Sequence, residues 1–176
     1  MATTALISVL CPDRVGLVAA IAGRLFDLGG NLGDTKFAVL GGGAEFTSIC
    51  ELPQGVTLDT VKRDLETLPE LAEAEEISVR PFGMPAMQGP SGEITHRIVV
   101  GGGDRPGLIA RLCEVFVQFH ANIVRLNADR RAGADQNQYA ITMHVRIPEG
   151  SAEACLATIC NTAGELRLTC RWDKVA

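Results

Sequence analysis

The chain has 176 residues, of which 47% are hydrophobic and 21% are charged, a composition typical of a soluble globular protein. Phosphate binding requires a concentrated basic surface, so a net charge of −5 argues against direct contact with nucleic acid. No apolar run approaches the roughly 20 residues of a transmembrane helix, which argues against a membrane protein.

The cysteines predict reduced thiols rather than a disulfide framework. They stand at positions 11, 50, 113, 155, 160 and 170, form no Cys-x-x-Cys pair, and mostly fall on apolar faces. The N-terminal residues enter a strand pattern without a basic segment or cleavage site, so we expect no signal peptide and a cytoplasmic location. His96, His120 and His144 lie in three different elements without ligand spacing, so neither a metal site nor another cofactor is expected.

The first half of the chain predicts six elements in the order strand, helix, strand, strand, helix, strand. The predicted strands are Thr4–Leu10, Leu32–Leu40, Ala44–Leu52 and Glu76–Phe82, and the predicted helices are Val15–Leu28 and Leu58–Leu68. Apolar residues at helical spacing identify the helices. Gly29 and Gly30 end the first helix, and the three glycines 41–43 indicate a hairpin.

The second half predicts the same six elements. Its strands are Thr95–Gly101, Ile123–Arg130, Gln138–Ile147 and Leu166–Trp172, and its helices are Pro106–Phe119 and Ala152–Asn161. Residues 81–92 contain three prolines and three glycines, which is typical of a linker. We therefore expect one domain over residues 1–80, a linker over 81–92 and a second domain over 93–176.

The two halves also repeat a motif. Asp13-Arg14-Val15-Gly16-Leu17 returns as Asp104-Arg105-Pro106-Gly107-Leu108, an offset of 91 residues. Leu52–Gly55 returns as Ile147–Gly150 at an offset of 95, so the second copy carries a four-residue insertion. A unit of this length is a duplicated domain rather than a short solenoid repeat. The βαββαβ order predicts an α+β fold of two ferredoxin-like units, each with an antiparallel sheet and both helices on one face.

The repeated motif lies where the first strand turns into the first helix of each copy. A helix N-terminus presents unpaired amide N–H groups and a partial positive charge, both of which favour a carboxylate. Gly16 and Gly107 would allow close approach to those amides. Asp13 and Asp104 could cap the helix or receive an ammonium group, and Asn31 and Asn122 could be turn residues or ligand contacts. Together these groups could hold both ends of a free amino acid.

The pattern Asp-Arg-[Val/Pro]-Gly-Leu-[Val/Ile]-Ala, followed by a helix and Asn-[Leu/Ile], resembles the ACT domain, a regulatory module that often responds to amino acids. Two such repeats alone resemble the glycine cleavage system transcriptional repressor group. The resemblance implies that ACT units pair through their sheets and bind ligands near the paired interface. The implied ligand-binding residues are Asp13, Arg14, Val15, Gly16, Leu17, Asn31 and Leu32 in one site, and Asp104, Arg105, Pro106, Gly107, Leu108, Asn122 and Ile123 in the other. His120 replaces Gly29 in the second copy, which predicts a reshaped or empty second site.

We expect a non-catalytic regulator that responds to glycine or a similar amino acid, acts through a protein partner and forms homo-oligomers. Neither a pair of carboxylates nor a Ser/His/Asp set stands out to support catalysis. One alternative is a ligand-free protein-interaction module. Another is a regulatory subunit that acts in trans on an enzyme of amino-acid metabolism.

Strand alternation predicts a basic open face on the second sheet. Ile141, Met143, Val145 and Ile147 should face the helices. Arg97, Arg146, Arg167 and Arg171 should then point away from the helices. We expect this face to dock an acidic surface.

Overall fold

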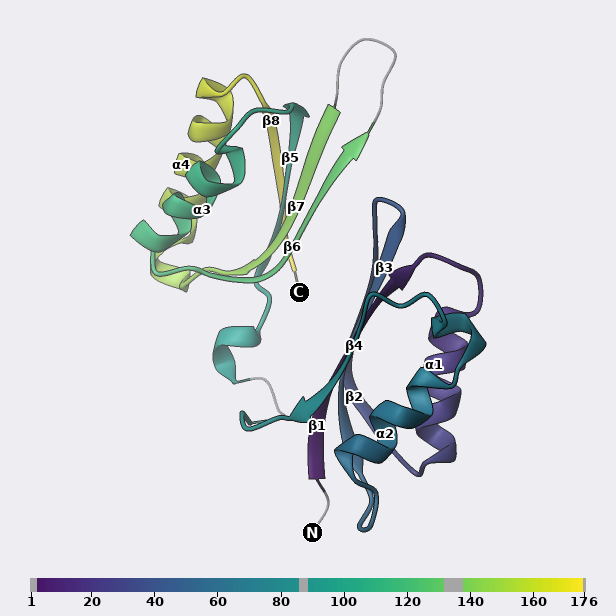
Figure 1. Ribbon diagram of the computed structural model, residues 1–176. Helices are drawn as coiled ribbons and strands as arrows, with labels where there is room; N and C mark the ends of the chain where they lie inside the picture. Colours follow the sequence, from purple (N-terminus) through teal and green to yellow (C-terminus); the bar gives the residue numbers. More distant parts are fainter. Residues whose placement is uncertain (1–2, 86–88, 132–137, 176) are drawn as a thin grey trace. The chain divides into compact units, whose positions relative to one another are not determined.

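The computed structural model describes residues 3–85, 89–131 and 138–175 of the chain. The chain divides into two compact units, Met1–Ala86 and Met87–Ala176, which we describe separately as unit 1 and unit 2. Each unit has the order strand, helix, strand, strand, helix, strand (Figure 1). The predicted βαββαβ order is therefore confirmed for both copies. None of the helices in the described ranges has the length and apolar character needed to cross a bilayer.

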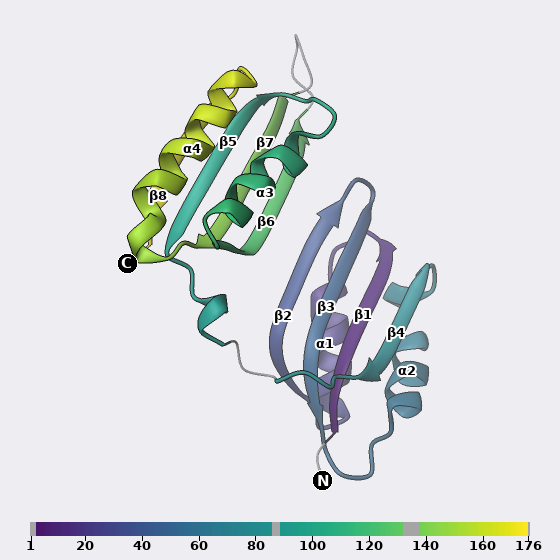
Figure 2. The ribbon, with the colours of Figure 1, turned by 90° about the vertical axis from the view of Figure 1, so that its left-hand side faces the viewer.

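Unit 1 is a four-stranded antiparallel sheet covered on one face by two helices (Figure 2). Its strands are β1 (Thr3–Pro12), β2 (Asn31–Leu40), β3 (Gly43–Leu52) and β4 (Glu76–Pro81); its helices are α1 (Leu17–Asp27), α2 (Leu58–Glu66) and the short 3-10 helix η1 (Pro69–Leu71). The strand order is β2-β3-β1-β4, so β1 lies inside the sheet and β2 at its edge.

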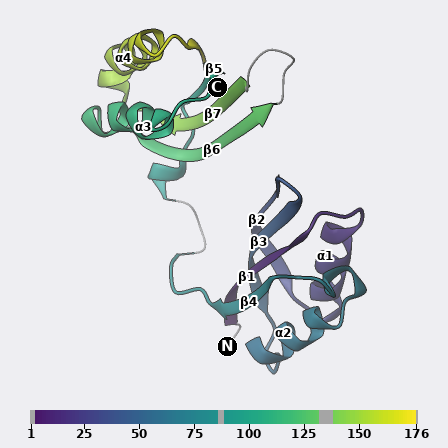
Figure 3. The same ribbon diagram turned by 45° about the horizontal axis from the view of Figure 1, so that its top comes forward.

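Unit 2 repeats this arrangement, with α3 and α4 in one layer and the sheet in the other (Figure 3). Its strands are β5 (His96–Gly103), β6 (Asn122–Arg131), β7 (Gln138–Arg146) and β8 (Thr169–Lys174); its helices are α3 (Leu108–Gln118), α4 (Ala152–Glu165) and the 3-10 helices η2 (Pro90–Gly92) and η3 (Glu149–Ser151). The order β6-β7-β5-β8 places β5 inside the sheet, as β1 is in unit 1.

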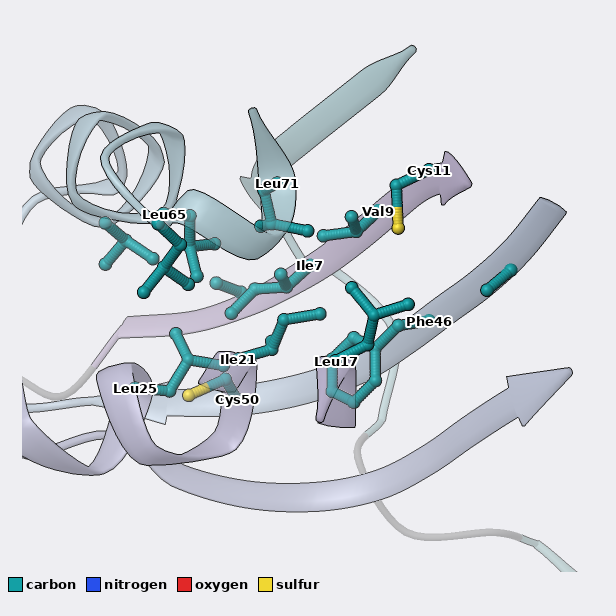
Figure 4. Close-up of a cluster of buried hydrophobic side chains, with 14 of the residues drawn as sticks. Ile7, Val9, Cys11, Leu17, Ile21, Leu25, Phe46, Cys50, Leu65 and Leu71 are labelled. Carbon is teal, nitrogen blue, oxygen red and sulfur yellow. The ribbon is translucent and has the colours of Figure 1, made fainter. Parts of the chain in front are cut away.

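The core of unit 1 lies between its sheet and its helices (Figure 4). Alternate residues of β1 face the helices, so Ile7 and Val9 are buried. They pack with Phe46 of β3, Ile21 of α1 and Leu65 of α2. Each fully buried side chain of this size contributes about 1.5–3 kcal/mol to folding, so this layer is the main stabilising contact of the unit.

The core of unit 2 follows the predicted alternation on β7. Ile141, Met143, Val145 and Ile147 are all at most 3% exposed, as expected for residues that face the helices. They pack with buried residues of β5, α3 and α4: Ile98, Val100, Leu112, Phe116 and Ile159.

Helices α1 and α3 are followed by the same kind of turn, although the residue in the turn is glycine after α1 and histidine after α3. Gly29 and His120 both adopt a left-handed conformation, with φ of 77° and 53°. The following N–H of Gly30 donates to the Leu25 carbonyl at 2.8 Å, and that of Ala121 donates to the Phe116 carbonyl at 2.9 Å. These bonds satisfy carbonyls that the helix end leaves unpaired. The turn therefore keeps the same left-handed conformation and hydrogen bond whether the residue is Gly29 or His120.

The placement of Arg167 on the open face of the second sheet is wrong. Helix α4 continues to Glu165, and β8 begins only at Thr169. Arg167 lies in the turn between them with a left-handed φ of 59°, and its N–H donates to the Gly164 carbonyl at 2.9 Å. Strand alternation does not extend back to Arg167, because this segment closes the helix.

The open face of the second sheet nevertheless carries several arginines. Arg97 and Arg125 both lie opposite His144 in the strand register, and Arg125 was absent from the sequence prediction. Arg171 projects to the same side, because it pairs with Val99, which is two residues from Arg97 on β5. Asp173 stands directly opposite Arg97 and offsets part of the charge. The face is therefore mixed in charge, and its docking to an acidic surface stays a prediction.

Gly30 occupies a position with no room for a side chain. An added Cβ would lie 2.9 Å from the Cys50 sulfur and 3.0 Å from the Leu25 carbonyl oxygen. Gly23, in the exposed part of α1, would meet nothing within 4 Å. Packing therefore requires glycine at position 30 but not at position 23.

We predict opposite effects of alanine at these two positions. Gly30→Ala should destabilise the chain by about 1–3 kcal/mol, because the backbone carbonyl must move to admit the methyl group. Gly23→Ala should stabilise it by about 0.5–1 kcal/mol, since alanine is the better residue in a helix interior. Urea unfolding followed by circular dichroism measures both. Equal midpoints for the two variants would contradict the packing at Gly30.

All six cysteines are free thiols, and burial favours the protonated form of five of them. Burial raises the pKa of Cys155 to about 11. Burial and a hydrogen bond with Cys160 raise the pKa of Cys170 to about 12. Burial also raises the pKa of Cys11, Cys50 and Cys113 above the ordinary value of 9.0.

These shifts predict that stability falls in alkaline solution. A thiol whose pKa is higher in the folded chain stabilises the fold fully below its unfolded pKa, and this contribution is lost as pH rises toward its folded pKa. For Cys155 the window runs from 9.0 to about 11. Urea unfolding in reductant at pH 7 to 10.5 should show a shallower decline for Cys155→Ala than for the unaltered chain. If the free energy of unfolding fell equally with pH in both proteins, the Cys155 thiol would not have the raised pKa.

Candidate functional site

The loop between β1 and α1 carries the repeated motif in unit 1. It runs from Asp13 to Gly16, directly before α1 begins at Leu17. Gly16 has a left-handed φ of 95°, and its carbonyl accepts the N–H of Ala20 at 2.8 Å. A Cβ at Gly16 would meet nothing within 4 Å, so backbone conformation rather than space requires glycine here. Close approach by a ligand, which the motif had suggested, is therefore not what requires glycine at this position.

The N-terminus of α1 has no side-chain cap. The N-cap residue is Gly16, and the first turn contains no acidic residue. Asp13 therefore does not cap the helix, which was the alternative to a ligand-binding role. The first amide N–H groups and the positive end of the helix dipole remain available to an anionic group.

Asp13 and Arg14 differ in their partners. The backbone N–H of Asp13 donates to the Gly42 carbonyl at 3.1 Å, which ties the loop to the β2–β3 turn. Its carboxylate is exposed and forms no ion pair within the described ranges. The guanidinium of Arg14 lies 3.3 Å from the Glu73 carboxylate. Asp13 is therefore the charged group of this loop that is available to a cation.

A hollow of about 380 Å³ lies at this loop. It is lined by residues 13–19 and by Phe37 of β2. Phe37 is 42% exposed and Val15 is fully exposed, so the hollow has apolar walls beside the carboxylate and the helix end. Its volume is within the range of small-molecule sites.

The equivalent loop of unit 2 has the same backbone. Gly107 is the N-cap of α3 with a left-handed φ of 79°, again without a side-chain cap. A hollow of about 370 Å³ is lined by residues 104–110 together with Arg130 and Tyr139. The repeated motif therefore forms the same type of hollow in both units.

Electrostatics distinguishes the two loops. In unit 2 the guanidinium of Arg130 lies 2.9 Å from the Asp104 carboxylate. The strand register places Val39 of unit 1 at the position of Arg130, because Val39 pairs with Ala44 as Arg130 pairs with Tyr139. Asp104 thus has an internal cation as its partner, whereas the uncharged Val39 leaves Asp13 without one.

The predicted contacts at the start of the second strands do not join these loops within a unit. Asn31 pairs with Glu51, whereas the Asp13 loop follows the other end of the sheet, where Pro12 pairs with Gly43. The ten residues of β2 that separate these ends span about 30 Å. In unit 2, Asn122 likewise begins β6 at the end of the sheet away from Gly103. Leu32 and Ile123 instead pack against the cores.

Three residues from outside the repeated motif also line the hollows. They are Phe37 in unit 1, and Arg130 and Tyr139 in unit 2. The predicted hairpins contained the necessary signal, since the end of the second strand must lie beside the end of the first once the third strand pairs with both.

The reactive groups to consider near the loop of unit 1, in the described residues, are a metal cluster and an activated thiol. Within the described ranges, no three His, Cys, Asp or Glu side chains come together in a way that could hold a metal ion. Cys11 precedes the loop, but burial raises its pKa more than the neighbouring Arg14 lowers it. Its thiol is therefore not an activated nucleophile.

Comparison with solved structures shows two chains of similar fold over their full lengths. An unknown protein from Galdieria sulphuraria has a TM-score of 0.76 and 20% sequence identity, with 100% of both chains covered. A candidate glycine cleavage system transcriptional repressor has a TM-score of 0.69 and 15% identity, with 99% of this chain and 98% of that chain covered. No protein-family model matches the sequence, and no curated protein matches it. In fold, the chain is a tandem pair of ACT-like ferredoxin-fold units.

Proposed function

We propose that this chain is a non-catalytic regulatory protein that binds a small amino acid at the β1–α1 loop of unit 1. The observation that carries the proposal is the hollow of about 380 Å³, in which an unpaired Asp13 carboxylate and an uncapped helix N-terminus lie together. An amino acid presents the complementary pair of charges. Its carboxylate would accept hydrogen bonds from the first amides of α1, and its ammonium group would pair with Asp13.

The ligand is expected to be small. The loop hollow is shallow and its apolar wall consists of Val15 and Phe37, both substantially exposed. Such a wall accommodates a short side chain or none, which favours glycine, alanine or serine. One full-length structural neighbour is described as a candidate glycine cleavage system repressor, and this supports glycine as the first ligand to test.

The second loop is proposed as a weaker site for the same ligand. A ligand ammonium must displace the guanidinium of Arg130 before it can reach Asp104. The side chain of Arg130 is 72% exposed, so this ion pair is worth only about 0.2–1 kcal/mol. The expected difference in affinity from this pair is therefore at most roughly fivefold.

Regulation further requires a surface that passes the signal on, and we propose that the edge of unit 1 provides it. The side chains of Phe37, Val39 and Leu40 on β2 are 42%, 50% and 60% exposed. An edge strand with unpaired backbone groups and exposed apolar residues is suited to pairing with another strand. We propose that β2 pairs with a second copy of the chain, and that a further protein partner binds the resulting assembly.

The ligand proposal predicts that the two aspartates contribute unequally. Calorimetric titration with glycine, alanine and serine should show a stronger and a weaker site. Asp13→Asn should weaken the stronger site by roughly 10- to 100-fold, because a hydrogen bond to a charged group is worth about 1.5–3 kcal/mol. Asp104→Asn should leave the stronger site unchanged.

Arg130→Val is the matched control, because it gives unit 2 the residue that unit 1 has at the equivalent position. It should strengthen the weaker site by up to roughly fivefold. The absence of heat and thermal shift with every amino acid at millimolar concentration would contradict sensing. Partner capture that is indifferent to both aspartates would favour the ligand-free interaction module.

The assembly proposal predicts that a charge on the inner side of β2 disrupts self-association. Val39→Asp should shift the chain from oligomer to monomer in sedimentation velocity, because a buried carboxylate without a cation partner is costly. Lys36→Ala, on the opposite side of the same strand, is the control and should leave the oligomer intact. A monomeric unaltered chain at micromolar concentration would refute the proposal. Co-purification from the native cell would distinguish a repressor partner from an enzyme of amino-acid metabolism.

A further inference from the structure

Unit 2 contains a second kind of hollow, away from the β5–α3 loop. Its volume is about 440 Å³, within the range of small-molecule sites. Helix α4, which packs against β8, supplies one wall through Leu156, Ala157 and Cys160. The opposite wall is formed by His96 of β5 and Trp172 of β8.

The aromatic wall combines an exposed ring with a buried one. Trp172 is 46% exposed although it lies on the helix side of the sheet, as its pairing with the buried Ile98 shows. His96 is only 6% exposed, and its ring meets the indole edge to face with centroids 6.1 Å apart. The Nδ1 atom of His96 lies 2.9 Å from the Thr95 hydroxyl oxygen, which fixes the ring. The hollow therefore opens at the indole and is closed at the imidazole.

The residues that create this hollow are specific to unit 2. By strand register, Trp172 replaces Val79, and His96 replaces Ala5. On the helix, the offset of 95 residues that relates Leu52 to Ile147 places Ala157 at the position of Lys62 and Cys160 at that of Leu65. Unit 2 thus has larger side chains on the strands and smaller ones on the helix. A fold that preserved only core packing would not require this exchange.

The rim of the hollow carries two charged groups that have no partner in the described parts of the chain. Neither Lys174 nor Glu153 takes part in an ion pair there. The ammonium of Lys174 is close enough to His96 to lower the pKa of the imidazole, in addition to the larger effect of burial. The apolar interior therefore has one cation and one hydrogen-bond acceptor at its edge.

We propose that this hollow binds a planar aromatic carboxylate that also carries a ring O–H or N–H donor. The ring would pack against Trp172 and Leu156, since aromatic pairs gain energy beyond their buried area. The carboxylate would pair with Lys174, and the donor would reach Glu153. This inference is independent of the proposed amino-acid site, because it involves neither Asp13 nor Asp104.

Trp172 is the only tryptophan of the chain, so its indole N–H gives a single side-chain resonance in a ¹H–¹⁵N spectrum. Titration with 4-hydroxybenzoate should shift that resonance in a saturable manner. Cyclohexanecarboxylate, which lacks both the planar ring and the O–H donor, should bind at least about fivefold more weakly. 4-Hydroxybenzyl alcohol, which lacks the carboxylate, should bind up to about fivefold more weakly, as expected for the loss of an exposed ion pair.

Two variants of α4 provide a matched pair. Ala157→Leu should fill the hollow and weaken binding at least about tenfold. Ala154→Leu introduces the same side chain on the same helix at an exposed position outside the hollow, and should bind normally. Lys174→Gln tests the carboxylate contact without a change of packing, and should weaken binding by roughly fivefold or less.

Failure of this proposal is distinguishable from failure of the amino-acid proposal. An unshifted indole resonance at millimolar 4-hydroxybenzoate would overturn it, as would equal binding by Ala157→Leu and Ala154→Leu. Asp13→Asn should leave this titration unchanged, whereas it should weaken amino-acid binding at the stronger site by roughly 10- to 100-fold. A loss of aromatic-acid binding in Asp13→Asn would also overturn the assignment to this hollow.

Discussion

The inward side chains of the central strands β1 and β5 are the contacts on which the rest of each unit depends. These strands pair on both sides, so their alternate residues lie beneath both helices and between two neighbouring strands. A one-residue slip would expose the whole apolar set to solvent, so burial fixes the register. The register in turn fixes where the loop after β1 or β5 lies. It also fixes which residue of the edge strand faces the hollow at that loop.

Much of the fold could be predicted from the sequence because two independent signals agree. The helical spacing of apolar residues locates α1 and α3, and the duplication confirms which glycines and hairpins belong to the frame. The prediction was wrong at Arg167, where alternation alone cannot reveal that a helix runs on and closes through a left-handed residue. The motif identified the loops, but their distance from Asn31 and Asn122 follows only from the alignment of the antiparallel strands within one unit, which the repeat between the two copies does not provide.

Duplication explains why two loops with the same backbone can differ in function. Gly16 and Gly107 keep the positive φ that the strand-to-helix turn requires, so the shape of both loops is fixed by the fold. The residue at the end of the edge strand is outside the core and free to change. A valine there leaves one carboxylate unpaired, and an arginine neutralises the other. Likewise, exchanges beneath α4 open a hollow in unit 2 without altering the strand order.

The ion pair between Arg130 and Asp104 has a consequence for how the chain would respond to changing ligand supply. Two identical loops would fill over the same narrow interval of concentration and give one step. The exposed ion pair in one loop raises the ligand concentration needed to fill that loop by a modest factor. Occupancy would therefore rise in two overlapping stages. The regulated range would then be broader than that of a single site. Because salt screens exposed charges, the width of that range would itself depend on ionic strength.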